Sequence, residues 1–330
     1  MRFCVSFLVG LVWLASPAVA WNAHGHKIIA SIAFRKLEAN EQARVIAILK
    51  KHPRYAEDFA GQMPAEIAAG EARGQQEWLL QQAAVWPDIV RGFTGELSER
   101  YHHPTWHYVN QPHYLLGTDR AALEGKLHVN TALDPPATTE QAMNVVQTIG
   151  RARRVLKTPD ASDTDKALML CWLLHTIGDI HQPLHSTALF SEKLFPEGDR
   201  GGNLVRTKQS RNLHSLWDGF LGESNEFAAA RNRALALLAD SSSANVGAEA
   251  AEELDERKWL DESHQLAIAA AYDPALLAYL RLRAMAGEGA DFPPLDCSED
   301  YLKAGGRISE RRVVQAGYRT AGVLRSLLAE

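Results

Sequence analysis

Hydrophobic residues recur every three or four positions along most of the chain, which is the period of an α-helix with one buried face. Alternation with a period of two, which would indicate strands bounded by hairpin turns, is not convincing at any point. The pattern therefore predicts an all-α protein. The expected helices cover 28–37, 45–49, 143–155, 168–180, 227–238, 259–272, 276–285 and 309–328.

Residues that begin and end helices refine two of these elements. Thr138 or Thr139 can cap the helix that follows, and Ser162 can cap the next one, which Gly178 and Pro183 bring to an end. The segments 98–136 and 183–211 are rich in His, Pro, Gly and Asn, so we expect loops there. Glycines and prolines in 286–306 indicate a surface excursion.

The first 20 residues have the pattern of a secretory signal peptide. Arg2 is their only charge, an apolar run follows from Phe3 to Ala15, and small residues close the segment. The run is shorter than the roughly 20 residues of a membrane-spanning helix. We expect a secreted or periplasmic protein that begins at Trp21, with residues 21–330 forming one large helical domain because no linker divides them.

The net charge of the chain argues against a simple basic surface that binds nucleic acid. Removing the leader takes one arginine from 35 basic side chains and leaves 40 acidic ones, a net charge of −6. Any polyanion site therefore needs another source of positive charge. Cys171 and Cys297 can pair or stay free, and the sequence favours neither outcome. We expect a monomer.

Histidines and aspartates form pairs at helical ligand spacing. His175 and Asp179 lie one turn apart, His185 follows at the turn, and His214 and Asp218 repeat the spacing. Such a pair is usually a solvated helix face. Here the pairs are embedded in apolar residues, and a buried charge needs a compensating partner, which a metal ion or an ion pair can supply.

The motifs around these pairs resemble the S1/P1 nuclease family. Residues 175–185 read H-T-I-G-D-I-H-Q-P-L-H, 198–203 read G-D-R-G-G-N, and 212–218 read N-L-H-S-L-W-D. Upstream, 21–26 read W-N-A-H-G-H, 86–91 read W-P-D-I-V-R, and 106–110 read W-H-Y-V-N, while Trp259, Glu262, Ser263 and Ala267 also fit. The resemblance runs in order from Trp21 to about Tyr272, and it implies the helical fold of phospholipase C and P1 nuclease.

The resemblance also implies three zinc ions per chain. The first would take Asp88, His107, His175 and Asp179. The second would take His185, His214 and Asp218. The third would take the α-amine and carbonyl of Trp21, with His26 and Asp179, so that Asp179 bridges two ions. Three Zn²⁺ ions would add six positive charges to a chain of net charge −6, which answers the objection from charge.

By the same resemblance, the protein is a secreted endonuclease that acts on single-stranded DNA and RNA and on 3′-nucleotides. Metal-assisted hydrolysis would break the P–O3′ bond and leave 5′-phosphates. Asp88 would orient the nucleophile, and Arg91, one turn away, would hold a phosphate oxygen. Tyr108 would stack a base, or it simply packs in the core. Asn110 stands where family members often have an acid that reads the base.

Two other functions compete with this interpretation. A zinc phospholipase C shares the scaffold, but its second zinc motif resembles H-x-x-x-E, whereas His214 here is followed by Asp218. A non-catalytic zinc-binding protein of the periplasm would need closed metal sites, and the mixture of Asp and His argues against a purely structural role.

Overall fold

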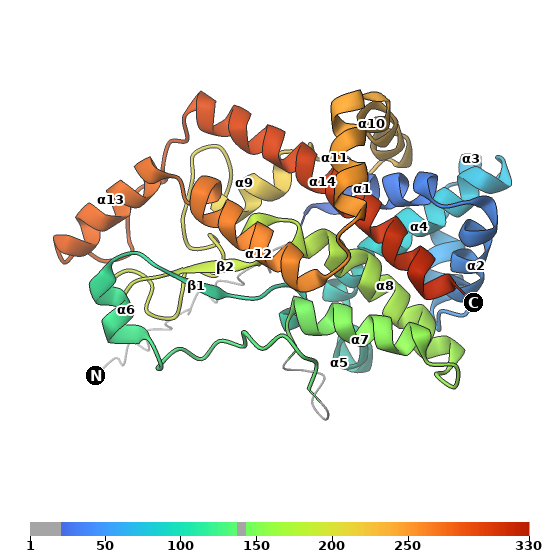
Figure 1. Cartoon of the computed structure of the whole chain (residues 1–330), viewed down its shortest axis with the longest axis horizontal. Coiled ribbons are helices and arrows are strands. Elements are labelled where there is room, and N and C mark those ends of the chain that lie inside the picture. The colour runs from blue at the N-terminus through green and yellow to red at the C-terminus, as the bar shows by residue number, and fades with distance from the viewer. Residues whose placement is uncertain (1–20, 137–142, 330) are drawn as a thin grey trace, which may run out of the picture.

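The computed structural model describes residues 21–136 and 143–329, and helices dominate them (Figure 1). The α-helices are α1 (Ala23–Lys36), α2 (Ala39–Leu49), α3 (Ala65–Ala68), α4 (Ala72–Ile89), α5 (Gly95–Tyr101), α6 (Gly117–Leu123), α7 (Val145–Lys157), α8 (Asp163–Ile180), α9 (Leu213–Gly219), α10 (Phe227–Ala239), α11 (Ser241–Ala251), α12 (Glu256–Leu266), α13 (Pro274–Met285) and α14 (Glu299–Leu328). Single turns of 3₁₀ or π helix extend several of them. The predicted all-α class is confirmed, with two short strands added, β1 (Gln111–Tyr114) and β2 (Thr187–Phe190).

One predicted helix cap is confirmed, and the other falls outside the described residues. Ser162 caps α8 as expected, since its Oγ accepts a hydrogen bond from the Asp165 amide at 3.0 Å. The cap predicted at Thr138 or Thr139 lies outside the described residues, and α7 begins later, at Val145. Asn144 is the cap there, because Asn144 and Gln147 exchange side-chain and backbone hydrogen bonds, each 3.1 Å long.

The segments expected to be loops hold more structure than predicted. The interval 98–136 contains the end of α5, β1 and α6, and the interval 183–211 contains β2. The predicted surface excursion at 286–306 is wrong in its second half, because α14 begins at Glu299, ten residues before the expected start. Ser298 caps α14 by accepting a hydrogen bond from the Tyr301 amide at 3.2 Å. The helices α3, α4 and α11 were not predicted.

Helix α8 lies at the centre of the packing. It contacts α1, α2, α4, α7 and α14, and its apolar side chains join one large core with those of α4 and α7. Helix α14 crosses the molecule in Figure 1 and packs along α1. Gly317 allows this close approach, since a Cβ there would lie 2.5 Å from Ile32 Cγ2. The C-terminal half of α8 is thereby enclosed by helices from both ends of the chain.

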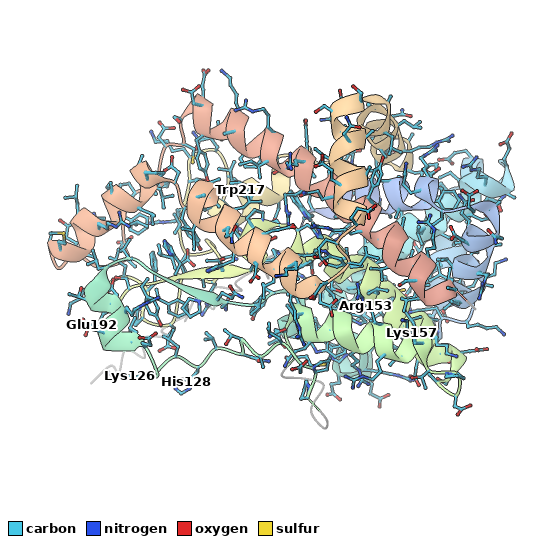
Figure 2. The ribbon with its side chains drawn as sticks, viewed as in Figure 1. Lys126, His128, Arg153, Lys157, Glu192 and Trp217 are labelled. Carbon is cyan, nitrogen blue, oxygen red and sulfur yellow. The ribbon has the colours of Figure 1, made fainter. Side chains whose placement is uncertain are left out.

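The two strands are parallel and bring two distant segments together. Gln111 pairs with Thr187, and the register continues to Tyr114 and Phe190. A second core of apolar residues lies around β2, α9 and α13, and it includes the buried Trp217 labelled in Figure 2. Within 21–136 and 143–329, every helix is too short or too polar to cross a membrane.

Candidate metal centre

The C-terminal half of α8 supplies the central pair of the site. His175 and Asp179 are fully buried, and His175 Nε2 lies 3.2 Å from Asp179 Oδ2. His26, from the first turns of α1, stacks on His175 with ring centroids 4.0 Å apart. Its Nε2 lies 3.2 Å from the other Asp179 oxygen, Oδ1. Helix packing thus surrounds the Asp179 carboxylate with two imidazole rings.

Two further side chains reach the same pair from other elements. His107 ends a 3₁₀ turn, Pro104–His107, and its Nδ1 lies 3.0 Å from both Asp179 Oδ2 and His175 Nε2. Asp88 lies in the last turn of α4, with Oδ1 3.7 Å from His175 Nε2. Five of the residues predicted as ligands therefore meet around α8.

A separate group forms where β2 and α9 begin. His185, just before β2, and His214, in the first turn of α9, face each other with their Nε2 atoms 3.0 Å apart. Asp218 lies one turn beyond His214, with Oδ2 3.6 Å from its Nε2. All three residues are buried.

The structure therefore contains three buried His/Asp groups whose ligand atoms are close enough to hold metal ions. Within each group the atoms lie within 4.8 Å of one another. The groups are His26, His175 and Asp179; Asp88, His107 and His175; and His185, His214 and Asp218. His175 belongs to two groups, whereas the sequence motifs led us to expect Asp179 as the shared residue. Contacts of Asp179 with His26, His107 and His175 keep that residue in the same cluster.

Backbone carbonyls fix the orientation of three of the imidazole rings. His175 Nδ1 donates to Ala84 O at 2.7 Å, His185 Nδ1 to His107 O at 2.6 Å, and His214 Nδ1 to Gly201 O at 2.7 Å. A carbonyl can only accept, so Nδ1 carries a proton, and in a neutral ring the Nε2 lone pair faces the cluster. Burial acts against protonation of His175, but the carboxylates of Asp179 and Asp88 raise its pKa. Metal-binding histidines are held in this way by a partner behind the ring.

The spacing of the facing ligand atoms suits metal coordination better than direct hydrogen bonds between those atoms. Two neutral nitrogens 3.0 Å apart cannot both accept, yet ligand atoms of one tetrahedral zinc ion are about 3.3 Å apart. His107 Nε2 and Asp88 Oδ2 are buried and have no hydrogen-bond partner in the described chain. Orphaned buried donors and acceptors of this kind are rare, and a cation would satisfy them.

Burial and neighbouring charges also favour lone pairs facing a cation. Burial, with the charge of Arg91, lowers the pKa of His107 to about 3, and burial beside His185 lowers that of His214 to about 3. Burial opposes ionisation of Asp179, but His175 and its hydrogen bonds hold the Asp179 pKa well below the usual value. Burial raises the pKa of Asp218 well above the usual value of an aspartate. Cations would stabilise both carboxylates in the ionised form.

The remaining predicted site residues lie around this cluster. Arg91 forms an ion pair with Asp88, with Nη2 2.9 Å from Asp88 Oδ1, and its side chain is 8% exposed. Tyr108 is 37% exposed, so the alternative that it packs in the core is wrong. Asn110 is half-buried just before β1. Trp21 is fully buried against the first turn of α1, where a Cβ on Gly25 would lie 2.9 Å from Trp21 Cβ.

Supporting residues were missed by the sequence interpretation. Gln182 is fully buried, and its Nε2 donates to Asp218 Oδ1 at 2.8 Å. Asp199 accepts hydrogen bonds from the Leu189 and Gly202 amides and from the Tyr272 hydroxyl. Both residues lie inside recognised motifs, which was the available signal. Cys171 and Cys297 are free thiols, so they do not pair.

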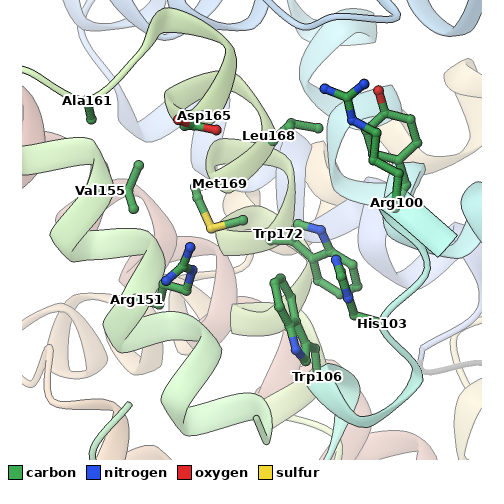
Figure 3. Close-up of a pocket in the computed structure, with 11 residues that line it drawn as sticks. Arg100, His103, Trp106, Arg151, Val155, Ala161, Asp165, Leu168, Met169 and Trp172 are labelled. Carbon is green, nitrogen blue, oxygen red and sulfur yellow. The ribbon is translucent and has the colours of Figure 1, made fainter. Parts of the chain in front are cut away.

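A cavity of about 350 Å³ opens between α5, α7 and α8 (Figure 3). Among the described residues that line it, none belongs to the three His/Asp groups. Trp172 separates the two regions, with its ring 5.2 Å from that of His107. Other histidines, such as the exposed His128 at the edge of the molecule in Figure 2, also lie outside the cluster.

Several buried His/Asp groups inside a helical scaffold are typical of metal-assisted hydrolases of phosphate esters. Comparison with known proteins agrees, since the sequence matches the S1/P1 Nuclease family over residues 21–329. The chain therefore belongs to the S1/P1 nuclease family, and it is a hydrolase.

Similar proteins include three endonucleases of Arabidopsis thaliana. Endonuclease 4 is 26% identical over 328 residues, which cover 97% of this chain and 93% of that protein. Endonuclease 2 is 26% identical, with 77% and 74% covered. Endonuclease 5 is 25% identical, with 68% and 64% covered. The match to Endonuclease 4 thus includes every element that carries a candidate ligand.

Proposed function

We propose that this protein is a secreted, zinc-dependent endonuclease that cleaves single-stranded DNA and RNA to products with 5′-phosphates, and that it removes the phosphate of 3′-nucleotides. The observation that carries the proposal is the convergence of buried Asp and His donors around α8, with three rings oriented from behind by carbonyls. Imidazole with carboxylate is the ligand set of catalytic zinc. Membership of the nuclease family supports a nucleic-acid substrate.

We assign nine residues to three zinc ions. They are Trp21, His26, Asp88, His107, His175, Asp179, His185, His214 and Asp218. When bound, zinc acidifies a water molecule and stabilises the charge that develops on the phosphate and on the departing 3′-oxygen. The α-amine and carbonyl of Trp21 would form a chelate with the ion at His26. The buried position of Trp21 against the start of α1 supports this.

The chain itself positions the substrate. Asp88 is placed to orient the attacking water, and the Arg91 guanidinium, whose Nη2 lies 2.9 Å from Asp88 Oδ1, can donate to a phosphate oxygen. Tyr108 offers an exposed ring on which one base stacks. Stacking is worth about 1–3 kcal/mol per base, and a base inside a duplex must first unstack to reach the ring. We therefore expect a preference for unpaired strands, with Asn110 contacting the base.

The metals can be tested on purified protein that begins at Trp21. Metal analysis of a folded sample should find three zinc ions per chain, and replacing Asp179 by Ala should disturb two of them. Fewer than two tightly bound zinc ions in the wild-type protein would refute the assignment.

The substrate is tested in parallel on single-stranded DNA, duplex DNA, RNA, 3′-AMP and phosphatidylcholine. We expect unpaired strands to be cut faster than duplex, with 5′-phosphate ends. Tyr108→Ala should raise KM, whereas Tyr108→Phe, which keeps the stacking face, should not. Products with 3′-phosphates contradict the proposed reaction. Cleavage of phosphatidylcholine alone favours a phospholipase, and bound zinc without hydrolysis favours a binding protein.

A further inference from the structure

Arg200 has a backbone conformation that its side chain disfavours. Its φ is 58°, and it is the one residue other than glycine with a positive φ in the part of the chain that the structure describes. The left-handed region is unfavourable for residues with a Cβ, and glycine occupies it without strain. Gly198, Gly201 and Gly202 beside it also have positive φ. A glycine at position 200 would therefore satisfy the loop more easily than arginine does.

The loop cannot relax around Arg200, because it is anchored on both sides. The Asp199 carboxylate accepts hydrogen bonds from Leu189 and Gly202 amides at 2.9 and 3.0 Å. Gly201 O accepts from His214 Nδ1, and a Cβ on Gly201 would lie 2.3 Å from Leu184 O. Arg200 is thus held next to the group formed by His185, His214 and Asp218.

The Arg200 side chain is exposed, and its guanidinium makes no hydrogen bond or ion pair with another described residue. Tyr108 borders the same His185–His214 pair, since Val109 N donates to His185 O at 2.8 Å. A free cation and an exposed aromatic ring therefore flank one metal-site candidate.

We propose that Arg200 binds the phosphate of the nucleotide adjacent to the one whose base lies on Tyr108, and so favours nucleic-acid strands over mononucleotides. The inference rests on the proposed function. A 3′-nucleotide carries a single phosphate, which the metal centre takes, so it gains nothing from a second cation. A strand carries a further phosphate, and a guanidinium can hold it through two donors.

The test compares Arg200→Gln, Arg200→Lys and Arg200→Gly with the wild type on a single-stranded DNA oligonucleotide and on 3′-AMP. Arg200→Gln should lower kcat/KM for the oligonucleotide about fivefold, the effect of one exposed charged contact, and change 3′-AMP hydrolysis less than twofold. The slope of log kcat/KM against log salt should become less negative by about 0.7, the value for one phosphate contact on a single strand. Arg200→Lys should keep most of the rate on the oligonucleotide.

Arg200→Gly separates side chain from backbone. It should lower kcat/KM for the oligonucleotide about as much as Arg200→Gln does. It should also melt about 2 °C higher than Arg200→Gln, because the backbone strain at position 200 is gone. Arg154→Gln removes a matched exposed charge from α7 and should leave both the rate and the salt slope unchanged.

An equal loss of kcat/KM on the oligonucleotide and on 3′-AMP would overturn the inference. An unchanged salt slope in Arg200→Gln, or the same change of slope in Arg154→Gln, would also overturn it. In each of these cases the wild type still hydrolyses both substrates, so the proposed function stands. A wild type that hydrolyses neither substrate refutes the proposed function, and the inference falls with it.

Discussion

Gly178 is the position at which a single methyl group should damage the metal centre. It lies in α8 between His175 and Asp179, and a Cβ there would lie 2.7 Å from His26 Nδ1 and 2.9 Å from His26 Cε1. The His26 ring is fully buried and stacks on His175 at 4.0 Å with an interplanar angle of 14°. It cannot turn away without breaking that stack.

The net effect of Gly178→Ala on stability follows from two opposing terms. Alanine in a helix interior is worth about 0.5–1 kcal/mol relative to glycine. Overpacking a buried contact costs about 1–3 kcal/mol. We therefore expect a loss of roughly 0–2.5 kcal/mol in the free energy of unfolding without metal. The variant should also bind one ion fewer per chain, because His26 loses its position beside Asp179.

Gly306→Ala provides the matched control. Gly306 is also inside a helix, α14, and a Cβ there meets nothing within 4 Å, so the same substitution should stabilise by about 0.5–1 kcal/mol. Urea unfolding in the presence of a chelator measures the stability of both variants, and metal analysis of the folded proteins measures the ion content. If Gly178→Ala is stabilised as much as Gly306→Ala and keeps every ion, the reasoning about His26 is refuted.

Three further predictions concern the surroundings of the site. Gln182→Leu removes the donor to Asp218 and should weaken the binding of one ion about 10–100-fold, measured by chelator competition, whereas unchanged affinity would deny Gln182 this supporting role. One residue added before Trp21 converts its amine to an amide, so the extended protein should fold but lose one zinc ion and most of its activity. Equal ion content in extended and native-start protein would contradict the ligand role of Trp21. Burial raises the pKa of Asp199 from 3.8 to about 6, so ionising this carboxyl costs the folded state ~3 kcal/mol. The stability that protonated Asp199 contributes at acid pH is therefore lost as the pH rises from about 4 to 6. Asp199→Asn should remove this pH dependence, which urea unfolding at pH 4 and pH 7 can check, and an identical pH profile in the variant would contradict the assignment.

The hydrophobic pattern predicted the helices in which buried residues recur at regular spacing. Ser162 caps α8 as expected, and the pair His214 and Asp218 meets across one turn because helical spacing alone brings its members together. The meeting of His26 with Asp179 is different, since it depends on how α1 packs against α8. Only the resemblance to a family, and not the spacing, placed those residues in one cluster.

Other parts of the site had no signal in the hydrophobic pattern. Helix α4, which carries Asp88, is rich in Ala and Gln and contains Pro87 in its last turn, so its periodicity is weak and a proline suggests an end. The paired strands are four residues each, too short for alternation to stand out. Asn144 replaced the expected threonine caps because Gln147 completes a capping box with it.

The carbonyl groups that orient His175, His185 and His214 have a consequence for mutational tolerance. Every residue has a main-chain carbonyl, so substitution at Ala84 or His107 changes the side chain there but leaves the acceptor chemically intact. In a saturation scan, Ala84 should accept small apolar replacements that fit its buried place in α4. The positions least tolerant of substitution should instead be those that hold the carbonyl in place. Gly201 is the main example, because any side chain there would clash with Leu184 O. Intolerance to substitution at Gly201 would then mark the backbone geometry that positions His214, and not a side chain that takes part in the chemistry.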